Sequence, residues 1–559
     1  MGSEPTIFLL ACLVSLGLTA LIREIAPRFG LTDDPDGHRK LHGRATPVGG
    51  GVAVFLTTAV ILGTLWLTPG SPVDDNDLPA DDSVTSAIAP ATTPDATVET
   101  PVETPVETPV ETPVETTVDA TDEKATDPAT ETRDMAAYIA QEPGDLPSKL
   151  RDGYDELPTL LLAGLVIVVV GLIDDRKGLR GKHKLLGQIA AAIILMSGGL
   201  VIHRIALLDH VVSLGYLAYP FTLCWLLGAI NSLNLLDGID GLATVLGIIL
   251  SFAIAAMAVV TGNAAVAIIA MVFAGSLLGF LRFNYPPASI FLGDSGSMLI
   301  GLVVGALAIG GSLKGPGTVL LAAPLAIWTI PFFDSVAAIL RRKLTGRSVY
   351  DTDRGHLHHR MLALLGSNRK VLGWIAACCA VITVALLVGL VRKNDFIVLL
   401  TCIGIVAMFI ATGAFGRAEL FLVGTRLRGF GRVLVSPLFP RRGAAWQTSL
   451  RLQGNRQWDL LWNTFIESAD KLDLLRIRLD LNLPTMHEAY HATWERPAGS
   501  RNDYRWHVEI PLMQRQLPMG LIRVTGRCGQ GSSCAEMQQL LDLIEPFEQR
   551  LRALVLDDA

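Results

Sequence analysis

The chain has 559 residues, of which 50% are hydrophobic and only 18% are charged, and its mean hydropathy is +0.43. This composition is typical of a protein that crosses a membrane several times and carries soluble appendages. The net charge of −7 gives no case for a nucleic-acid partner, because acidic residues gather in one segment and basic residues in others. The seven cysteines include no C-x-x-C pair, which argues against a disulfide framework.

Apolar runs recur along the chain, each close to the length that a bilayer requires. The first follows Glu4 and lacks both a basic start and a small-residue cleavage site, so we interpret it as a membrane helix and not as a signal peptide. We therefore expect an all-α polytopic membrane protein with about eleven transmembrane helices. The expected spans are residues 7–22, 48–67, 157–173, 185–202, 217–236, 242–261, 263–281, 296–312, 318–340, 371–391 and 396–415.

Residues 70–156 differ in composition from the spans on either side. They contain a V-E-T-P array that starts at Val98 and repeats to Thr116, with many Asp and Glu and few large apolar side chains. Such a segment cannot bury enough apolar surface to fold, and proline at every fourth position favours extended chain. We predict a disordered, acidic, Thr/Pro-rich insert at 70–156, which separates residues 1–69, with the first two spans, from a catalytic core at 157–415.

Loop charge predicts how the spans are oriented. The loops around residues 23–47, 176–184, 282 and 341–370 and the segment 417–442 are basic and fall on one side, while the acidic insert falls on the other. By the positive-inside rule the basic side is cytoplasmic, so the insert is extracytoplasmic and the C-terminal tail cytoplasmic.

The tail divides into a basic interfacial linker, residues 416–443, and a small soluble α+β domain, residues 444–559. Periodicity in this domain predicts a helix, four strands and a closing helix, which is compatible with a GAF- or PAS-like sensor fold. The predicted elements are Asp459–Leu475, Arg476–Leu483, Ala489–Arg496, Tyr504–Leu512, Leu521–Thr525 and Ser533–Leu554.

The most informative stretch is N-S-L-N-L-L-D-G-I-D-G-L-A, residues 231–243, which joins two apolar runs. Asn231, Asn234, Asp237 and Asp240 recur every three residues, and on a helix such residues are neighbours. Gly238 and Gly241 can break the helix and let a ligand approach the backbone. A solvated turn rarely needs two amides and two carboxylates at such spacing, and ionisable groups at a membrane edge are functional by default.

Four further polar clusters fall on the same predicted side. Taken singly each is modest evidence, since Asp174-Asp175 can be a solvated helix end and the histidines a basic loop. The clusters are Asp34 to Gly50 with Lys40 and His42; Gly171 to Lys184 with Asp174 and Asp175; Arg282 to Ser297 with Phe291 and Asp294; and Pro331 to Arg360 with Asp334, Arg354, His356, His358 and His359.

The chemistry of these side chains is consistent across the clusters. Carboxylate and amide oxygens are ligands for Mg²⁺, with Mn²⁺ as the alternative. Lysine, arginine and histidine beside a hard cation suit a diphosphate, whose charge must be neutralised as it is broken.

The sequence resembles the polyprenyl-phosphate N-acetylhexosamine-1-phosphate transferase family, that is, glycosyltransferase family 4. The matching stretches are G-L-I-D-D-R-K-G-L at 171–179, residues 231–243, N-Y-P-P-A-S-I-F-L-G-D-S-G-S at 284–297, and 341–362 with H-L-H-H-R. The last motif is closer to the branch that uses UDP-N-acetylglucosamine than to the muramoyl-pentapeptide branch. The insert and the C-terminal domain depart from the simplest members.

The resemblance implies Mg²⁺-dependent transfer of a sugar 1-phosphate from a UDP-sugar, most simply UDP-GlcNAc, to undecaprenyl phosphate at the cytoplasmic face of a bacterial inner membrane, with release of UMP. Its partners are therefore a UDP-sugar, undecaprenyl phosphate and membrane lipid; a homodimer is a candidate assembly. The implied metal ligands are Asp294 and Asn234, and the implied catalytic residues are Asp174, Asp175, Asp237 and Asp240. The implied substrate contacts are Lys40, His42, Asn231, Phe291, Arg354, His356, His358 and His359.

Three alternatives stay open at the level of sequence. Another UDP-HexNAc or the UDP-MurNAc-pentapeptide could be the donor. Transfer could pass through an aspartyl phosphate, although direct attack is favoured because an ionised lipid phosphate needs little activation. A membrane transporter is the rival from another class, but its charges should lie near the bilayer midplane and in repeated halves.

Overall fold

The computed structural model describes the membrane part and most of the C-terminal domain. The described residues are 4–33, 45–68, 146–207, 210–311, 318–320, 322–345, 356–392, 394–413, 416–417, 419–421, 423–424, 427, 446–453, 458–469, 474–483, 488–496, 505–514, 517–527 and 533–556. The array of V-E-T-P repeats, and the prediction of disorder made for it, lie outside these residues.

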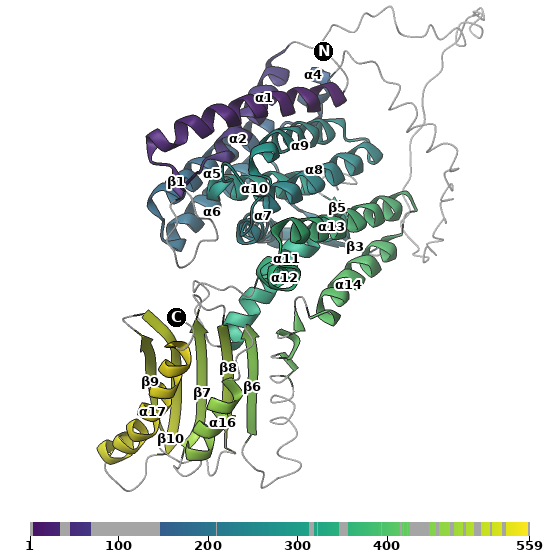
Figure 1. Cartoon of the computed structure of the whole chain (residues 1–559). Coiled ribbons are helices and arrows are strands. Elements are labelled where there is room, and N and C mark those ends of the chain that lie inside the picture. The colour runs from purple at the N-terminus through teal and green to yellow at the C-terminus, as the bar shows by residue number, and fades with distance from the viewer. Residues whose placement is uncertain are drawn as a thin grey trace, which may run out of the picture. The chain divides into compact units, whose positions relative to one another are not determined.

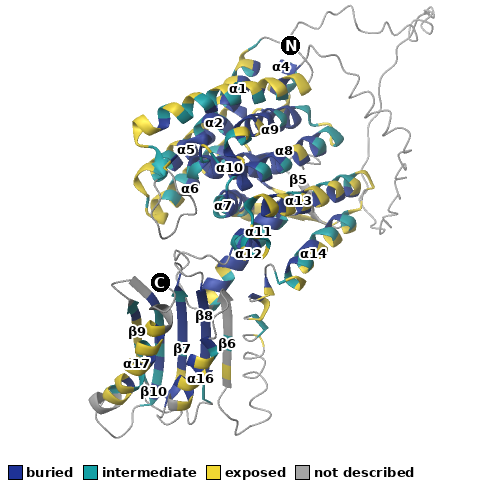
Figure 2. Ribbon diagram, viewed as in Figure 1, coloured by how far each residue is buried: buried dark blue, intermediate teal, exposed yellow. Residues whose placement is uncertain are grey.

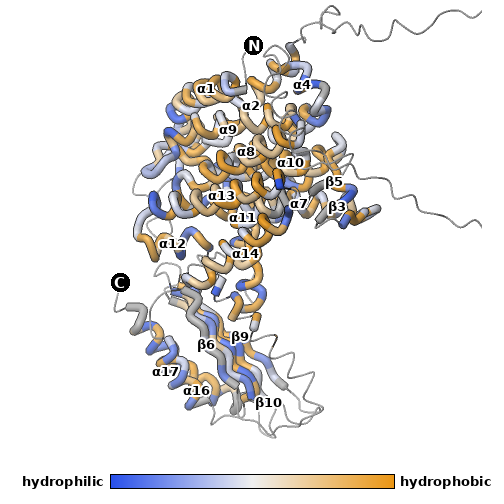
Figure 3. The backbone as a smooth tube through the Cα atoms, turned by 90° about the vertical axis from the view of Figure 1, so that its right-hand side faces the viewer, coloured by the Kyte–Doolittle hydropathy of each residue, from blue (hydrophilic) through white to orange (hydrophobic). Residues whose placement is uncertain are grey.

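Long apolar helices dominate the membrane part (Figures 1 and 3). Each of the eleven expected spans overlaps a helix, and eight helices within the described residues are long and apolar enough to cross a membrane. The polytopic membrane character is thus confirmed, and the count of eleven stays a prediction. The helices are α1 (Glu4–Ile25), α2 (Gly50–Leu67), α5 (Leu157–Lys177), α6 (Gly181–Ser197), α7 (Ala218–Leu236), α8 (Leu242–Val260), α9 (Ala264–Asn284), α10 (Gly293–Gly311), α11 (Ala322–Thr345), α13 (Asn368–Val391) and α14 (Asp395–Ala411).

Helix α10 is the centre of this bundle (Figure 2). Of its most apolar window 89% is buried, against 22% for α1. Glycines allow its first turn to approach two neighbours at backbone distance: a Cβ on Gly51 of α2 would lie 2.3 Å from the Gly296 nitrogen, and a Cβ on Gly171 of α5 would lie 2.3 Å from the Ser295 Cα. The close approach of α2, α5 and α10 brings three of the sequence clusters together.

Two expectations about the membrane part were wrong in detail. The part is not purely α-helical, since it contains an antiparallel pair and a three-stranded sheet of order β4-β3-β5. The insert also ends earlier than residue 156, because α4 (Leu146–Gly153) is folded, with Leu150 fully buried and the Arg151 side chain donating to the Thr68 carbonyl at 3.2 Å. The short elements are η1 (Ala26–Phe29), β1 (Thr32–Asp33), β2 (Thr46–Pro47), β3 (Arg204–Leu207), β4 (His210–Ser213), η4 (Gly215–Leu217), β5 (Thr318–Leu320) and α12 (Leu357–Leu365).

The turn between α7 and α8 corrects the helical spacing expected for residues 231–243. Helix α7 ends at Leu236, so Asp237 is its C-cap and Asp240 lies in the turn. Gly241 has a φ of +76°, which an L side chain rarely adopts, and it is the N-cap of α8. Only Asn231 and Asn234 share a helical face; the two carboxylates reach the site from the turn.

The C-terminal domain is a five-stranded antiparallel sheet of order β6-β8-β7-β10-β9 with α16 and α17 (Figure 1). Trp462, Phe465 and Phe547 of the helices share one apolar cluster with Ile477, Leu479 and other strand residues. The sequence missed β6, and the first helix is shorter than predicted; the sensor-like assignment stays a prediction. The elements are β6 (Trp446–Gln453), α16 (Trp458–Ala469), β7 (Leu474–Leu483), β8 (Glu488–Glu495), β9 (Arg505–Gln514), β10 (Leu517–Arg527) and α17 (Ser533–Leu556).

Candidate active site

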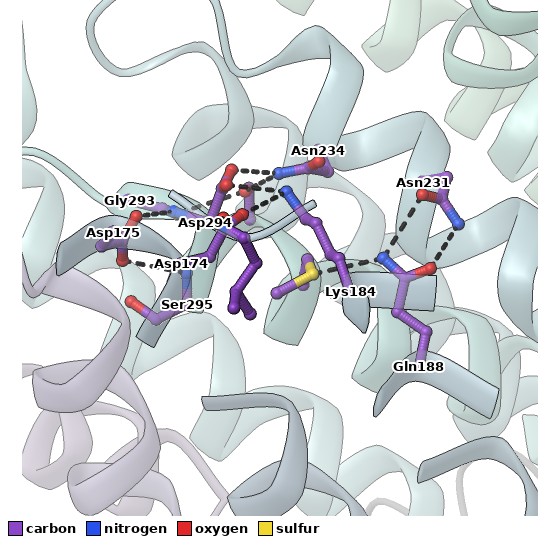
Figure 4. A network of polar contacts seen from close by, with 12 residues as sticks. Asp174, Asp175, Lys184, Gln188, Asn231, Asn234, Gly293, Asp294 and Ser295 are labelled. Carbon is purple, nitrogen blue, oxygen red and sulfur yellow. Dashed lines mark hydrogen bonds and ion pairs between the residues drawn. The ribbon is translucent and has the colours of Figure 1, made fainter. Parts of the chain in front are cut away.

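The centre of the site is an ammonium group between two carboxylates (Figure 4). The Lys184 Nζ, at the start of α6, lies 2.7 Å from Asp294 Oδ2 and 3.1 Å from Asp174 Oδ2. Asp294 comes from the first turn of α10 and Asp174 from the last turn of α5, so three helix ends converge here. Both carboxylates were expected in the site. Lys184 had been noted only as a neighbour of the second cluster.

Asp175 has a different role from its neighbour Asp174. Its carboxylate accepts hydrogen bonds from the backbone N–H of Asp294 at 2.7 Å and of Ser295 at 3.3 Å, and so caps the N-terminus of α10. Gly293, with a φ of +77°, makes room for it: a Cβ there would lie 2.6 Å from Asp175 Oδ2. Asp175 thus fixes the helix end from which Asp294 projects.

The two asparagines of α7 are held by different partners. The Asn234 amide donates to Asp294 Oδ1 at 2.6 Å and to the Ser297 hydroxyl at 3.0 Å, which supports its expected place beside Asp294. Asn231, one turn earlier, exchanges hydrogen bonds with the buried Gln188 of α6 at 2.8 and 3.3 Å. In this structure the Asn231 amide therefore joins α6 to α7.

The turn after α7 adds two carboxylates. Burial and the neighbouring carboxylates of Asp294, Asp175 and Asp240 raise the pKa of Asp237 well above its usual range. Asp240 instead accepts a hydrogen bond from the backbone N–H of Ala288 at 3.0 Å. It anchors the segment between α9 and α10 to the turn, while Asp237 lies close enough to Asp294 and Asp175 for their charges to act on it.

Phe291 lies in the segment between α9 and α10 and forms hydrogen bonds with the residues that lead into α2. Its backbone N–H donates to the Pro47 carbonyl at 2.8 Å, and its carbonyl accepts from the Gly50 N–H at 3.0 Å. Its ring is partly buried. These hydrogen bonds attach Pro47 and Gly50, which follow the first basic loop, to the residues just before α10. Lys40 and His42 of that loop, and Arg354 of the fifth cluster, lie outside the described residues.

The histidines of the fifth cluster are held by a buried carboxylate. Asp334 of α11, fully buried, contacts His356 Nδ1 at 2.8 Å through one oxygen and accepts from the Leu357 N–H at 2.8 Å through the other. It thereby fixes the start of α12 and the ring of His356. The His356 and His358 rings are nearly parallel at 5.9 Å, and the His358 and His359 rings are 4.3 Å apart.

His358 connects this helix to the aspartate turn. Its ring occupies the place where a Cβ of Gly238 would be, with Nε2 only 2.0 Å from that position. Within the described part of the chain, neither of its ring nitrogens has a hydrogen-bond partner, although His358 is 2% exposed. Burial, and then the charges of His359 and His356, lower the pKa of His358 well below its usual range. The ring is therefore neutral at physiological pH, with one nitrogen that can donate and one that can accept a hydrogen bond.

A metal site would have to be built from these donors. Among the described residues, no group of three or more His, Cys, Asp or Glu side chains is arranged to hold a metal ion. The chemistry of the oxygens nevertheless fits a hard divalent cation, because the carboxylates of Asp174 and Asp294 meet at a point where Lys184 already supplies positive charge. Asp294 and Asn234 remain the predicted ligands.

The structure adds three residues to the site for which the sequence analysis gave no role. Each is a polar side chain inside or beside an apolar run, and that is the signal by which it could have been found. They are Lys184, Gln188 and Asp334. Gln188 was missed altogether, because a single amide in an apolar helix carries no spacing pattern. Asp334 had been placed in the fifth cluster without a role.

Comparison with known proteins identifies the family. A family model described as glycosyl transferase family 4 matches residues 157–312, which include Asp174, Asn234, Asp237 and Asp294. A probable undecaprenyl-phosphate N-acetylglucosaminyl 1-phosphate transferase of Bacillus subtilis strain 168 is 34% identical over 258 residues, which cover 44% of this chain and 71% of that protein. The chain belongs to glycosyl transferase family 4. It is accordingly a transferase.

Other members of glycosyl transferase family 4 show how far the likeness reaches. A decaprenyl-phosphate N-acetylglucosaminephosphotransferase of Mycobacterium leprae is 38% identical over 38% of this chain and 60% of its own length. A phospho-N-acetylmuramoyl-pentapeptide-transferase of Lactococcus lactis is 35% identical over 37% of this chain and 64% of its own length. The relatives are thus named for two kinds of sugar, N-acetylglucosamine and the N-acetylmuramoyl-pentapeptide.

Proposed function

We propose that the protein transfers N-acetylglucosamine 1-phosphate from UDP-GlcNAc to undecaprenyl phosphate, releases UMP, and thereby initiates synthesis of a cell-envelope polysaccharide. The observation that carries the proposal is the convergence of Asp174, Asp294 and Lys184 at 2.7–3.1 Å where three helices end. A lipid phosphate anchored in the bilayer and a water-soluble nucleotide sugar can meet at such a helix-end site. The relatives named for this reaction point the same way.

Direct attack accounts for the reaction most simply. An oxygen of the ionised lipid phosphate bonds to the sugar-linked phosphorus, the bond from that phosphorus to the bridging oxygen breaks, and UMP leaves with the bridging oxygen. Asp175 supports this route, because both its oxygens accept backbone N–H groups of α10. Asp174 is likewise engaged, by Lys184 and by the Leu179 N–H at 2.5 Å. The ionised phosphate needs no base.

Charge neutralisation is the main contribution of the protein side chains in this proposal. Lys184 offers an ammonium to the phosphates, and the neutral ring of His358 offers a donor and an acceptor. His356 and His359, with Lys40, His42 and Arg354 outside the described residues, complete the contacts to the diphosphate. Phe291 is proposed to stack on uracil, with Asp240 holding its segment in place.

Dependence on a divalent metal is general in this family, and we propose Mg²⁺, with Asp294 and Asn234 as the residues that hold it. When bound, the ion would stabilise the negative charge that develops on the diphosphate. Asp237 would then lie beside a cation, whose charge opposes the rise in pKa that burial and the neighbouring carboxylates cause.

The location follows from loop charge and substrate. We propose a bacterial inner membrane with the site and the C-terminal domain on the cytoplasmic face, because the basic loops flank the site. Membrane embedding itself is supported by the apolar helices. A homodimer stays a prediction that no contact in this structure addresses.

A donor panel tests the proposal. The full-length protein, purified in detergent, is incubated with undecaprenyl phosphate, Mg²⁺ and UDP-GlcNAc, UDP-GalNAc or UDP-MurNAc-pentapeptide, and UMP is measured. We expect UMP release with UDP-GlcNAc, dependent on the lipid and lost on chelation. Preference for the pentapeptide donor would place the protein with its muramoyl relatives. No UMP from any donor, with substrate carried across vesicles instead, would favour a transporter.

A further inference from the structure

A buried ion-pair cluster joins the segment after α14 to helices α11 and α12. Glu419, in the segment that follows α14, forms an ion pair with Arg341 near the end of α11, and its Oε1 lies 3.9 Å from the Arg360 guanidinium of α12. The Glu419 side chain is 4% exposed and that of Arg341 3%. One carboxylate from the C-terminal linker therefore joins two helices of the core.

The two arginines of the cluster lie on either side, in the sequence, of the segment 346–355. Arg341 precedes residues 346–355 and Arg360 follows them, so Glu419 links the two sides of the segment that contains Arg354. The Arg360 backbone N–H donates to the His356 carbonyl at 3.2 Å in the first turn of α12. Asp334 holds the same turn through His356 and Leu357.

A buried pair of this kind is weak evidence for a gain in stability. Removing two charges from water costs several kcal/mol per ion, so a well-packed apolar pair is often as stable or more so. In some proteins a buried polar or ionic group is retained because it fixes one geometry, and this cluster spans three segments. We therefore consider what the cluster does for the position of α12.

We propose that Glu419 is a positioning residue, which holds α12 through Arg341 and Arg360 so that His358 faces the aspartate turn with His356 and His359 beside it. The proposal rests on the proposed function, in which these histidines contact the diphosphate of the nucleotide sugar. In this proposal the linker, residues 416–443, contributes to substrate binding, whereas the C-terminal domain that follows it does not. Glu419 itself contacts no substrate.

The first test separates binding of the two substrates. For Glu419→Gln, we expect the KM for UDP-GlcNAc to rise roughly 10- to 100-fold, because a misplacement of about 1 Å can cost 10²-fold. The KM for undecaprenyl phosphate should stay unchanged. The control is Glu548→Gln, which breaks the exposed pair between Glu548 and Arg552 on α17 and should change neither constant. An unchanged KM for the nucleotide sugar in folded Glu419→Gln would overturn the proposal.

A double variant separates position from stability. Arg341→Met with Glu419→Met replaces the buried ion pair by apolar side chains and should remain folded and monodisperse even if Glu419→Gln does not. We expect its KM for UDP-GlcNAc to stay raised, because Arg360 still lacks its carboxylate. A return to the wild-type KM would mean that the cluster serves stability alone, and the proposal would fail.

Chemical labelling of the histidines tests the position of α12 without any measurement of enzyme turnover. Diethylpyrocarbonate modification, followed by peptide mass spectrometry, should be slow at His356 and His358 in the wild type, since they are 5% and 2% exposed, and several-fold faster in Glu419→Gln. His203 and His210, both exposed, serve as references whose rates stay constant. Equal protection in both proteins would refute the proposal. A wild type that is protected but releases no UMP would instead refute the proposed function.

Discussion

Gly238 is the position where a single methyl group tests the geometry of the site. A Cβ at residue 238 would lie 2.0 Å from His358 Nε2, whereas ordinary contact begins at 3.4 Å. For Gly238→Ala the ring must therefore move by about 1.4 Å, or α12 must shift with it. The backbone of Gly238 is not in the left-handed region, so the clash is with the side chain alone.

The size of the effect follows from that displacement. A misplacement of about 1 Å costs on the order of 10²-fold in rate, which corresponds to roughly 2.7 kcal/mol. We expect kcat/KM for UDP-GlcNAc, measured by UMP release, to fall by about that factor while the protein remains folded. Gly63→Ala is the matched control, because a Cβ at Gly63 meets nothing within 4 Å, and its activity should be unchanged.

A double-mutant cycle identifies the cause. If Gly238→Ala acts by displacing His358, then adding it to His358→Ala should cost little beyond the effect of His358→Ala itself. Full activity of folded Gly238→Ala would refute the placement of His358 in the site. Additive losses in the double variant would mean that the methyl group disturbs the aspartate turn and not the histidine.

Other consequences can be measured with the same preparation. Asp294→Asn should abolish UMP release without loss of folded protein, because the site loses a charge that holds both Lys184 and the proposed metal; full activity at limiting Mg²⁺ would contradict this. The raised pKa of Asp237 means that the metal-free protein loses stability as the pH rises from below about 4, where the unfolded carboxyl ionises first. Asp237→Asn should remove this loss and raise the melting temperature at pH 7 while lowering turnover; an unchanged pH profile of melting would refute the shift. Deleting 70–145 behind a short linker should leave activity near normal, whereas deleting 70–156 also removes the buried Leu150 and Tyr154 and should destabilise the core by several kcal/mol; equal melting temperatures would show that α4 contributes nothing. Truncation near Pro440, which keeps Glu419, should leave a core that still releases UMP, and a monodisperse but inactive product would place part of the site in the C-terminal domain.

The amino-acid sequence was enough to predict a polytopic membrane protein and to propose most of the polar groups of the candidate site. Apolar runs of bilayer length report membrane helices directly, since backbone groups in lipid must be satisfied within the helix. The regular spacing of Asn231, Asn234, Asp237 and Asp240 indicated a functional site, because such groups are costly at a membrane edge unless they are used; phosphotransfer was implied by the family resemblance. Local signals of this kind need no knowledge of packing.

The tertiary structure alone decided which groups meet and what each one does. Asp174 and Asp175 are adjacent in sequence, yet one pairs with Lys184 and the other caps α10, because consecutive residues on a helix point in directions about 100° apart. The contact between His358 and Gly238 spans 120 residues, and that between Glu419 and Arg341 spans 78. Pairings at such separation depend on how helices pack, and no periodicity within a single helix encodes them.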